Sequence, residues 1–358
     1  MDSFNLENLV RNNIRKMRPY SSARHEFSGE ATVFLDANEN ALGSPLRFAV
    51  SRDSSPLNRY PDPLQHRLKE QIARIKGIPP SRIFLGNGSD EAIDLLFRIF
   101  CEPVTDNVII CPPTYGMYEV CADINNVKVK EVPLQSDYQL DLEAIAGSID
   151  VFTKLIFICS PNNPTGNSIY REDIELLLNN FDGIVVVDEA YINYARQRSF
   201  LPELTEYPNL VVLQTFSKAW GLAGLRLGMA FASEEVIHYF NKVKYPYNLG
   251  EHTQALALEA LQQMEQINDW TRQTVEQREW LAKQLAELPV TKRVYPSDAN
   301  FLLVAMDNAD KLFTYLTDTG IIVRNRSKVI LCDNSLRITV GTPEENQQLL
   351  NALKAYNA

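Results

Sequence analysis

The stretch LQTFSKAWGLAGLRLG, residues 213–228, ends an apolar run in a lysine. Beyond Lys218 the chain passes two glycines, reaches Arg226 and then a third glycine. Lysine and arginine side chains are almost never fully buried unless another group pairs with them. A cation at the end of an apolar strand therefore indicates a counter-ion or a ligand at this point of the fold.

Upstream segments repeat the pattern of a short apolar run followed by a helical segment. The apolar runs are RIFLG (82–86), NVIICPP (107–113), KLIFICS (154–160), GIVVVD (183–188) and NLVVLQ (209–214). Strands that are apolar throughout and alternate with helices predict an α/β fold, a mostly parallel sheet covered by helices on both faces. In such a sheet, ligands bind beyond the carboxyl ends of the strands. The residues expected at that edge are Gly88, Tyr115, Asn163, Asp188 and Lys218.

From about residue 250 the pattern changes to that of a smaller α+β domain. Residues 252–289 indicate one long amphipathic helix. Strand-like NFLLVAM (300–306), a helical segment, IIVRN (321–325), SLRITVG (335–341) and a closing helix follow. We expect an N-terminal arm with part of the small domain at 1–46, a large domain with the parallel sheet at 47–248, and a small C-terminal domain at 249–358.

The overall composition argues against several classes of protein. The chain has 358 residues, of which 45% are hydrophobic and 22% charged, as in a soluble protein of more than one domain. Its net charge of -10 argues against binding to nucleic acid or to an anionic membrane. The chain shows no signal-peptide core and no membrane-spanning run. Five cysteines without a C-x-x-C pair predict free thiols in a reducing cytoplasm, and no metal site.

Three of the predicted strand ends allow either a structural or a ligand-binding interpretation. LGNGSDEA (85–92) is either a plain capped turn with Ser89 as the N-cap or an anion site at a helix N-terminus. Tyr115 is either a half-buried core tyrosine or a plate on which a planar ring stacks. SPNNPTG (160–166) forms a rigid turn in either case, and it also presents the Asn163 amide to the sheet edge.

The charged strand ends have the same two interpretations. Asp188 caps a helix or pairs with a cation, and Lys218 forms a salt bridge to Asp188 or is a reactive amine with a depressed pKa. Arg226 packs its stem over the glycines or binds an anion. One planar ligand with a phosphate, a basic ring nitrogen and an aldehyde, pyridoxal phosphate, accounts for all of these residues together. Lys218 then forms the Schiff base, and Asp188 pairs with the ring nitrogen.

At this point the sequence resembles the fold-type-I pyridoxal-phosphate aminotransferases. SPNNPTG, DEAY (188–191) and FSKAWGLAGLRLG (216–228) follow that family's signature in order and spacing. RPYSSAR (18–24), LDANEN (35–40), NRYPDP (58–63), CPPTYGMY (111–118) and LRITVGT (336–342) extend the resemblance toward the histidinol-phosphate aminotransferases. The resemblance implies amino transfer between glutamate and a phosphorylated imidazole substrate in histidine biosynthesis, through a Lys218 aldimine.

The resemblance also assigns roles residue by residue. It makes Lys218, Asp188 and Tyr191 the catalytic residues. It assigns pyridoxal 5'-phosphate binding to Ser89, Asp90, Tyr115, Asn163, Asp188, Tyr191, Ser217, Lys218, Arg226 and Tyr60. Tyr60 is implied to act from the other subunit of a homodimer. Substrate binding is implied for Tyr20, Asn38, Arg324 and Arg337, among which Arg337 takes the α-carboxylate of glutamate and Arg324 the substrate phosphate.

Three other interpretations compete with this one. A threonine-phosphate decarboxylase or an aromatic aminotransferase shares the same signature, because electron-sink chemistry is common to all three enzymes. A nucleotide-binding oxidoreductase is suggested by Gly86-x-Gly88, but Glu91 stands where its third glycine belongs. A binding module without catalysis leaves a buried reactive amine at Lys218 unexplained.

Overall fold

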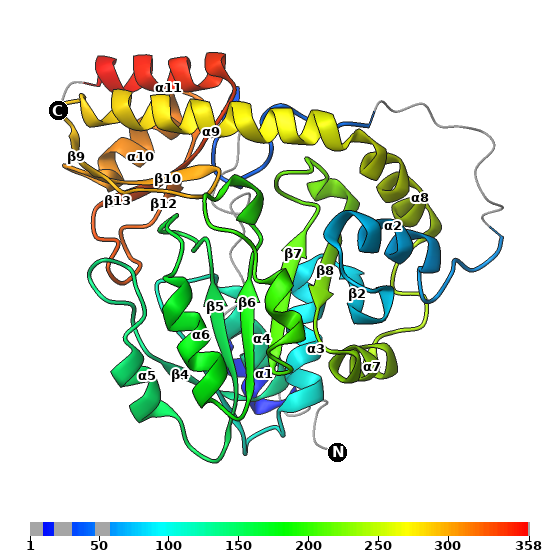
Figure 1. The fold of residues 1–358 in the computed structure, drawn as a ribbon. Helices are drawn as coiled ribbons and strands as arrows, with labels where there is room; N and C mark the ends of the chain where they lie inside the picture. The colour runs from blue at the N-terminus through cyan, green and yellow to red at the C-terminus, as the bar shows by residue number, and fades with distance from the viewer. Residues whose placement is uncertain (1–9, 18–30, 47–57, 357–358) are drawn as a thin grey trace, which may run out of the picture.

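The larger part of the molecule is built on a seven-stranded sheet (Figure 1). The computed structural model describes residues 10–17, 31–46 and 58–356. Within the sheet only β8 runs against its neighbours. The strands lie in the order β2 (Ile83–Asn87), β8 (Leu227–Phe231), β7 (Leu210–Thr215), β6 (Ile184–Asp188), β5 (Thr153–Cys159), β3 (Asn107–Ile110) and β4 (Lys128–Glu131). The five apolar runs expected to be strands are thus confirmed.

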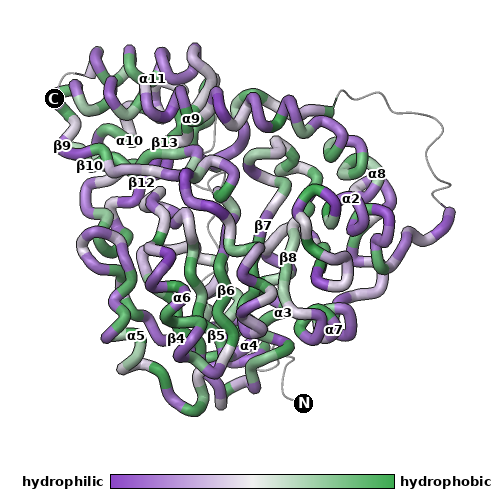
Figure 2. The backbone as a smooth tube through the Cα atoms, in the orientation of Figure 1, coloured by the Kyte–Doolittle hydropathy of each residue, from purple (hydrophilic) through white to green (hydrophobic). Residues whose placement is uncertain are grey.

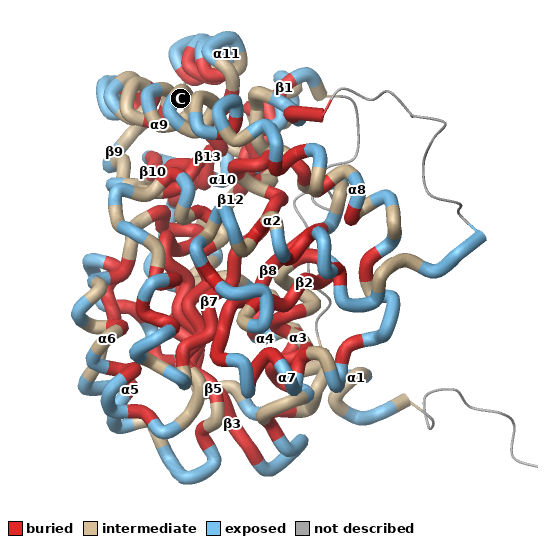
Figure 3. The backbone as a smooth tube through the Cα atoms, turned by 45° about the vertical axis from the view of Figure 1, so that its right-hand side comes forward, coloured by how far each residue is buried: buried red, intermediate tan, exposed pale blue. Residues whose placement is uncertain are grey.

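Helices cover both faces of this sheet. Successive residues of a strand point to opposite faces, so each strand contributes side chains to two buried clusters. In β6, Val185 and Val187 join one buried cluster while Val186 joins the other. The first cluster is completed by α2 (His66–Lys76), α5 (Leu142–Ser148), α6 (Arg171–Asn180) and α8 (Glu251–Ala260). The second is completed by α3 (Ser89–Phe100), α4 (Met117–Asn125) and α7 (Glu234–Val243). Figures 2 and 3 show the central strands as hydrophobic and buried.

A smaller unit sits above the carboxyl edge of the large sheet (Figure 1). Its antiparallel sheet has the order β12 (Arg324–Asn325), β13 (Ser335–Thr339), β10 (Phe301–Met306) and β9 (Thr291–Val294). It packs with α9 (Met264–Ala286), α10 (Ala309–Asp318) and α11 (Pro343–Ala355) around a third apolar cluster. The short strand β1 (Val33–Phe34) pairs in parallel with β11 (Ile321–Ile322). The division at 46/47 and 248/249 remains our proposal for the domain limits.

Two expectations about the second half of the chain need correction. The single long helix is two helices, α8 and α9, joined by a 3-10 turn at Leu261–Gln263. IIVRN is not one strand, because β11 pairs with β1 whereas β12 pairs with β13, so the segment is shared between two sheets. Short 3-10 turns also occur at Pro80–Arg82, Ile192–Tyr194, Leu201–Thr205 and Ala223–Leu225, and α1 is Asn12–Lys16.

The structure also bears on the sequence-based expectations about cysteines and membranes. All five cysteines are buried and unpaired, as expected. None of the helices described for residues 10–17, 31–46 and 58–356 is long and apolar enough to cross a membrane.

Candidate active site

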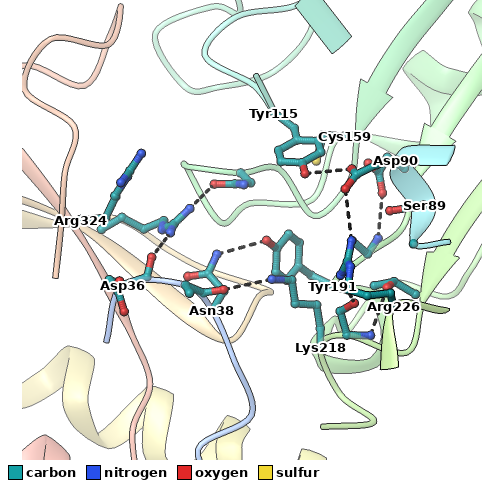
Figure 4. A pocket seen from close by; sticks show the side chains of 18 of the residues that line it. Asp36, Asn38, Ser89, Asp90, Tyr115, Cys159, Tyr191, Lys218, Arg226 and Arg324 are labelled. Carbon is teal, nitrogen blue, oxygen red and sulfur yellow. Dashed lines mark hydrogen bonds and ion pairs between the residues drawn. The ribbon is translucent and has the colours of Figure 1, made fainter. Parts of the chain in front are cut away.

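A cavity of about 230 Å³ opens at the carboxyl edge of the large sheet, where the small unit faces it. Almost every residue predicted for the site lines it (Figure 4). The predicted residues brought together there are Asn38, Ser89, Asp90, Tyr115, Asn163, Asp188, Tyr191, Ser217, Lys218, Arg226, Arg324 and Arg337. Strand β8 runs backwards, so its beginning lies at this edge and carries Arg226 into the same cavity.

One end of the cavity is an anion cradle formed by the start of α3 and Arg226. The helix begins at Ser89 with Gly88 as its N-cap and with no side-chain capping bond, so the expectation that Ser89 is the N-cap is wrong. Gly88 adopts φ 75° and ψ 169°, and a Cβ there would stand 2.6 Å from Nη2 of Arg226. Because no side chain occupies that space, the guanidinium lies directly against the turn. The positive end of the helix and the guanidinium together favour an anion.

The hydrogen bonds of Arg226 orient it over the cradle. Its Nη1 lies 3.5 Å from Oγ of Ser217, and its Nη2 lies 3.4 Å from Oδ2 of Asp90. Asp90 also accepts a hydrogen bond of 3.0 Å from the Tyr115 hydroxyl. The Arg226 side chain is 47% exposed, so the cradle opens to solvent rather than into the core. It can therefore exchange an anionic group with solution.

Asp188 ends β6 as a carboxylate within the apolar layer. It is buried, and burial raises its pKa to about 6. Hydrogen bonds from the Tyr118 hydroxyl to Oδ2 (2.8 Å) and from the Ala190 N–H to Oδ1 (3.1 Å) act in the opposite direction and lower the pKa. The site therefore holds a buried acid whose ionised form is stabilised by two donors and is suited to a cationic partner.

Lys218 follows β7 and points its amine into the cavity (Figure 4). Its Nζ donates to the carbonyl oxygen of Ala37 at 3.1 Å, and not to Asp188, so the structural alternative of a Lys218–Asp188 salt bridge is wrong. Burial, followed by the nearby charge of Arg337, lowers the pKa of Lys218 to about 8. About a tenth of the amine is therefore neutral at pH 7, far more than at the ordinary value of 10.5, and the neutral form is what a nucleophilic or basic amine requires.

Tyr191 and Asn163 both line the cavity, and each accepts a hydrogen bond from another residue of its lining. The Tyr191 hydroxyl accepts a hydrogen bond of 3.1 Å from Nδ2 of Asn38, and burial raises the pKa of Tyr191, so it stays a neutral phenol. Asn163, from the turn after β5, accepts a hydrogen bond of 2.7 Å from Nη1 of Arg337 through Oδ1. Both polar groups are thus fixed in direction before any ligand binds.

Both predicted arginines of the small unit line the cavity. Arg324 and Arg337 lie opposite each other on β12 and β13, hence on the same face of that sheet, and both are buried. Nη2 of Arg337 donates to the carbonyl oxygen of Asp36 at 2.5 Å. A guanidinium binds carboxylate and phosphate equally well in geometry, so this wall is suited to an anionic substrate.

Two predicted residues are not among those that the structure places in the cavity. Tyr60 is 79% exposed and stacks on Tyr247, with ring centroids 4.3 Å apart. Tyr20 lies outside the described residues. Within the described part of the chain there is no group of three or more acidic, histidine or cysteine residues arranged to hold a metal ion.

Sequence reasoning missed several residues at the site. Asp36, Cys159, Thr215 and Arg326 line the cavity, and Tyr118 bonds Asp188 from behind it. Arg326 could have been predicted from its place two residues after Arg324, just beyond the end of β12. The partner of Tyr118 lies 70 residues away in sequence, so nothing in its own segment indicates the contact.

Comparisons with known proteins agree with this geometry. The family model described as aminotransferase class I and II matches residues 32–353. A curated histidinol-phosphate aminotransferase from Parabacteroides distasonis is 54% identical over 98% of this chain and 98% of its own length. Its counterpart in Bacteroides thetaiotaomicron is 53% identical over 98% of this chain and 99% of its own length. A solved histidinol-phosphate aminotransferase from Clostridium acetobutylicum superposes with a TM-score of 0.82 at 26% identity and covers 90% of this chain and 98% of its own.

Proposed function

Because this chain belongs to the class I and II aminotransferase family, we propose that it transfers an amino group between histidinol phosphate and 2-oxoglutarate. The products are imidazole-acetol phosphate and glutamate, in a step of histidine biosynthesis that runs in either direction. It is a transaminase dependent on pyridoxal 5'-phosphate. The predicted fold class, an α/β fold with a mostly parallel central sheet, is confirmed.

The residues present fit that cofactor. The anion cradle at Gly88, Ser89 and Arg226 matches its phosphate, and the buried acid Asp188 matches its protonated ring nitrogen. The amine of Lys218 projects into the same cavity as both. The absence of a side chain at Gly88 is the most specific sign, because it lets the Arg226 guanidinium lie against the turn, where both can contact one anion.

When bound, the cofactor supplies an electron sink for the charge that develops at the substrate Cα. Lys218, with a pKa near 8, moves the proton to and from that carbon. Asp188 holds the ring-nitrogen proton by charge and hydrogen bonding. Tyr191 and Asn163, already fixed by Asn38 and Arg337, orient the ring's phenolic oxygen.

The substrate is bound by arginines of the small unit. Arg337 takes the α-carboxylate of glutamate through its fork, and Arg324 takes the phosphate of the other substrate. Histidinol phosphate carries no α-carboxylate, so one wall must accept a carboxylate in one half-reaction and a phosphate in the other. Two buried guanidinium groups on one face of β12–β13 support this assignment.

The observation that carries the proposal is the full-length relationship to histidinol-phosphate aminotransferases, together with the convergence of Lys218, Asp188 and Arg226 on one cavity. It is tested by single half-reactions of the purified enzyme with glutamate, histidinol phosphate, phenylalanine and threonine phosphate, followed by the visible absorbance of the cofactor. We expect histidinol phosphate and glutamate to convert it fastest. Conversion by histidinol phosphate no faster than by phenylalanine refutes the substrate assignment, and release of CO₂ from threonine phosphate indicates a decarboxylase.

The proposal extends to the assembly, a homodimer in which Tyr60 reaches the cofactor phosphate of the neighbouring subunit. Support comes from the exposed aromatic surface of Tyr60, Tyr245 and Tyr247, which is costly to leave in water. The test mixes two inactive variants, Tyr60→Ala and Lys218→Ala, after dissociation. A mixed dimer then carries one site with both native side chains, so activity returns on mixing. Failure to recover activity in a dimer shown to be mixed refutes the shared site.

We place the protein in the cytoplasm. Five buried, unpaired cysteines are typical of a reducing compartment, and the relatives are named for a biosynthetic reaction. Cell fractionation of a producing bacterium tests this, and recovery of the protein in the periplasmic fraction contradicts it.

A further inference from the structure

Tyr118 is a buried tyrosine whose hydroxyl points at the acid in the candidate site. It lies near the start of α4 and is 0% exposed. Its hydroxyl donates to Oδ2 of Asp188 at 2.8 Å. Its ring stacks on Phe157, with centroids 4.8 Å apart and planes at 19°, and Tyr115 meets it edge-on at 5.6 Å. Packing on these rings fixes the position of the hydroxyl oxygen beside Asp188.

We propose that Tyr118 is a positioning residue that keeps Asp188 ionised and fixes the plane of its carboxylate toward the cofactor's ring nitrogen. This inference rests on the proposed function, because it takes Asp188 to be the partner of that nitrogen. Tyr118 itself stands behind Asp188 and acts through it.

Geometry supports the fixed orientation. Each carboxylate oxygen of Asp188 receives its own donor, Oδ2 from Tyr118 and Oδ1 from the Ala190 N–H at 3.1 Å. The two donors come from different elements, α4 and the turn after β6, so rotation of the carboxylate breaks at least one of the bonds. With both bonds made, the remaining lone pairs have a defined direction before the cofactor binds.

The charges around Asp188 make a donor necessary. Burial disfavours its anion, and two further acids, Asp90 from α3 and Glu189 from its own turn, add to that effect. The group facing it from β5 is the Cys159 thiol, whose pKa is raised by burial and which therefore stays neutral. Tyr191 also faces it as a neutral phenol. Tyr118 is left as the side chain that stabilises the carboxylate.

Tyr118 is held in the donor state that this role requires. Burial, and then the charge of Asp188, raise its pKa well above the usual value for tyrosine. The phenol therefore keeps its proton throughout the range in which Asp188 ionises. Removing the hydroxyl leaves Oδ2 without this donor, so Asp188 takes up a proton at a higher pH than in the native chain.

The test compares Tyr118→Phe with a matched control, Tyr138→Phe. Tyr138 is also a buried tyrosine, but its hydroxyl donates to the carbonyl oxygen of Leu331 at 2.8 Å and not to a residue of the cavity. The probe is pyridoxamine 5'-phosphate, which has the ring nitrogen and phosphate but no aldehyde. Its affinity for the cofactor-free enzyme is measured from pH 5 to pH 9 by tryptophan fluorescence, since Trp220 follows Lys218 by two residues in the chain.

Loss of one hydrogen bond to a charged group makes Asp188 a weaker acid, so we expect Tyr118→Phe to weaken binding about tenfold at pH 5, where its carboxyl is mostly protonated, and about twofold at pH 7. Affinity falls as pH drops through the pKa of Asp188, and in the variant that fall moves upward by about one pH unit. Tyr138→Phe is expected to leave both quantities unchanged. Equal affinity and an equal pH profile for Tyr118→Phe and the native chain overturn the inference.

Two further measurements separate positioning from a merely structural role. A pyridoxamine phosphate analogue with carbon in place of the ring nitrogen is expected to bind the native chain and Tyr118→Phe equally well. In an Asp188→Asn background, adding Tyr118→Phe is expected to change affinity less than twofold. A full tenfold penalty at pH 5 in either measurement overturns the inference. Failure of the native chain to bind pyridoxamine phosphate at all overturns the proposed function instead.

Discussion

Replacing Gly88 by alanine tests how the anion cradle is built. Gly88 combines φ 75° with ψ 169°, a region of backbone space that is essentially restricted to glycine. Its missing side chain also leaves room for Arg226, since an added Cβ would approach Nη2 to 2.6 Å. The substitution therefore strains the turn and displaces the guanidinium at once.

Both consequences have an expected size. A residue other than glycine in this conformation costs about 1–3 kcal/mol, so the free energy of unfolding of the cofactor-free enzyme falls by that amount. A displaced guanidinium loses a charge-assisted hydrogen bond of about 1.5–3 kcal/mol to a bound phosphate. Affinity for pyridoxal phosphate should then decrease about 10- to 100-fold.

Gly147→Ala provides the matched control. Gly147 lies in helix α5, and an added Cβ there meets nothing within 4 Å. The same chemical change is expected to stabilise the protein by about 0.4–1 kcal/mol, because alanine restricts the unfolded chain more than glycine does.

The assay is thermal unfolding of both cofactor-free variants, with pyridoxal phosphate titration by visible absorbance. We expect the thermal midpoint to fall for Gly88→Ala and to rise for Gly147→Ala, and affinity to change only for the former. A Gly88→Ala protein with native stability and native affinity refutes the reasoning on the cradle.

Three further substitutions test the remaining parts of the site. Lys218→Met should abolish both half-reactions. It should also raise the thermal midpoint of the cofactor-free enzyme at pH 7, because burial holds the pKa of this amine near 8 and the folded state carries its charge unfavourably. That stability gain should shrink as pH rises from 8 toward the ordinary value of 10.5, so an unchanged gain at pH 10 contradicts the argument. Arg337→Lys replaces the two-pronged guanidinium by a single ammonium group and should raise KM for glutamate about tenfold or more. The rise in KM for histidinol phosphate should be smaller, and steady-state kinetics with each substrate measure both values. Arg324→Gln should show the reverse preference, and equal losses for both substrates would contradict the separate roles of the two arginines.

Much of the large sheet and its functional edge was predictable from local pattern. The apolar runs that became β3, β5, β6 and β7 are buried on both faces, and such strands appear as continuous hydrophobic segments. Polar residues at or just beyond their ends, such as Asp188 and Lys218, were placed at one edge because parallel strands share a carboxyl end.

Other strands were not predictable from their own residues. β8 (LGMAF) interrupts its apolar run with Gly228, and its antiparallel direction follows only from pairing with β2 and β7. IIVRN has one β pattern, yet it splits between two sheets because β1 and β13 each supply a separate edge. Partners distant in the chain decide such elements, and no local window contains them.

The sequence by itself determined the class of chemistry, because it places an amine, an acid, an anion-binding turn and arginines at or near the ends of predicted strands. Only the tertiary structure decided how each is tuned. Lys218 donates to the Ala37 carbonyl and not to Asp188, and the side chain that donates to Asp188 is Tyr118, 70 residues earlier. Residue type and strand position follow from local hydrophobic pattern, whereas ionisation and orientation depend on burial and on neighbours that only packing brings within hydrogen-bonding distance.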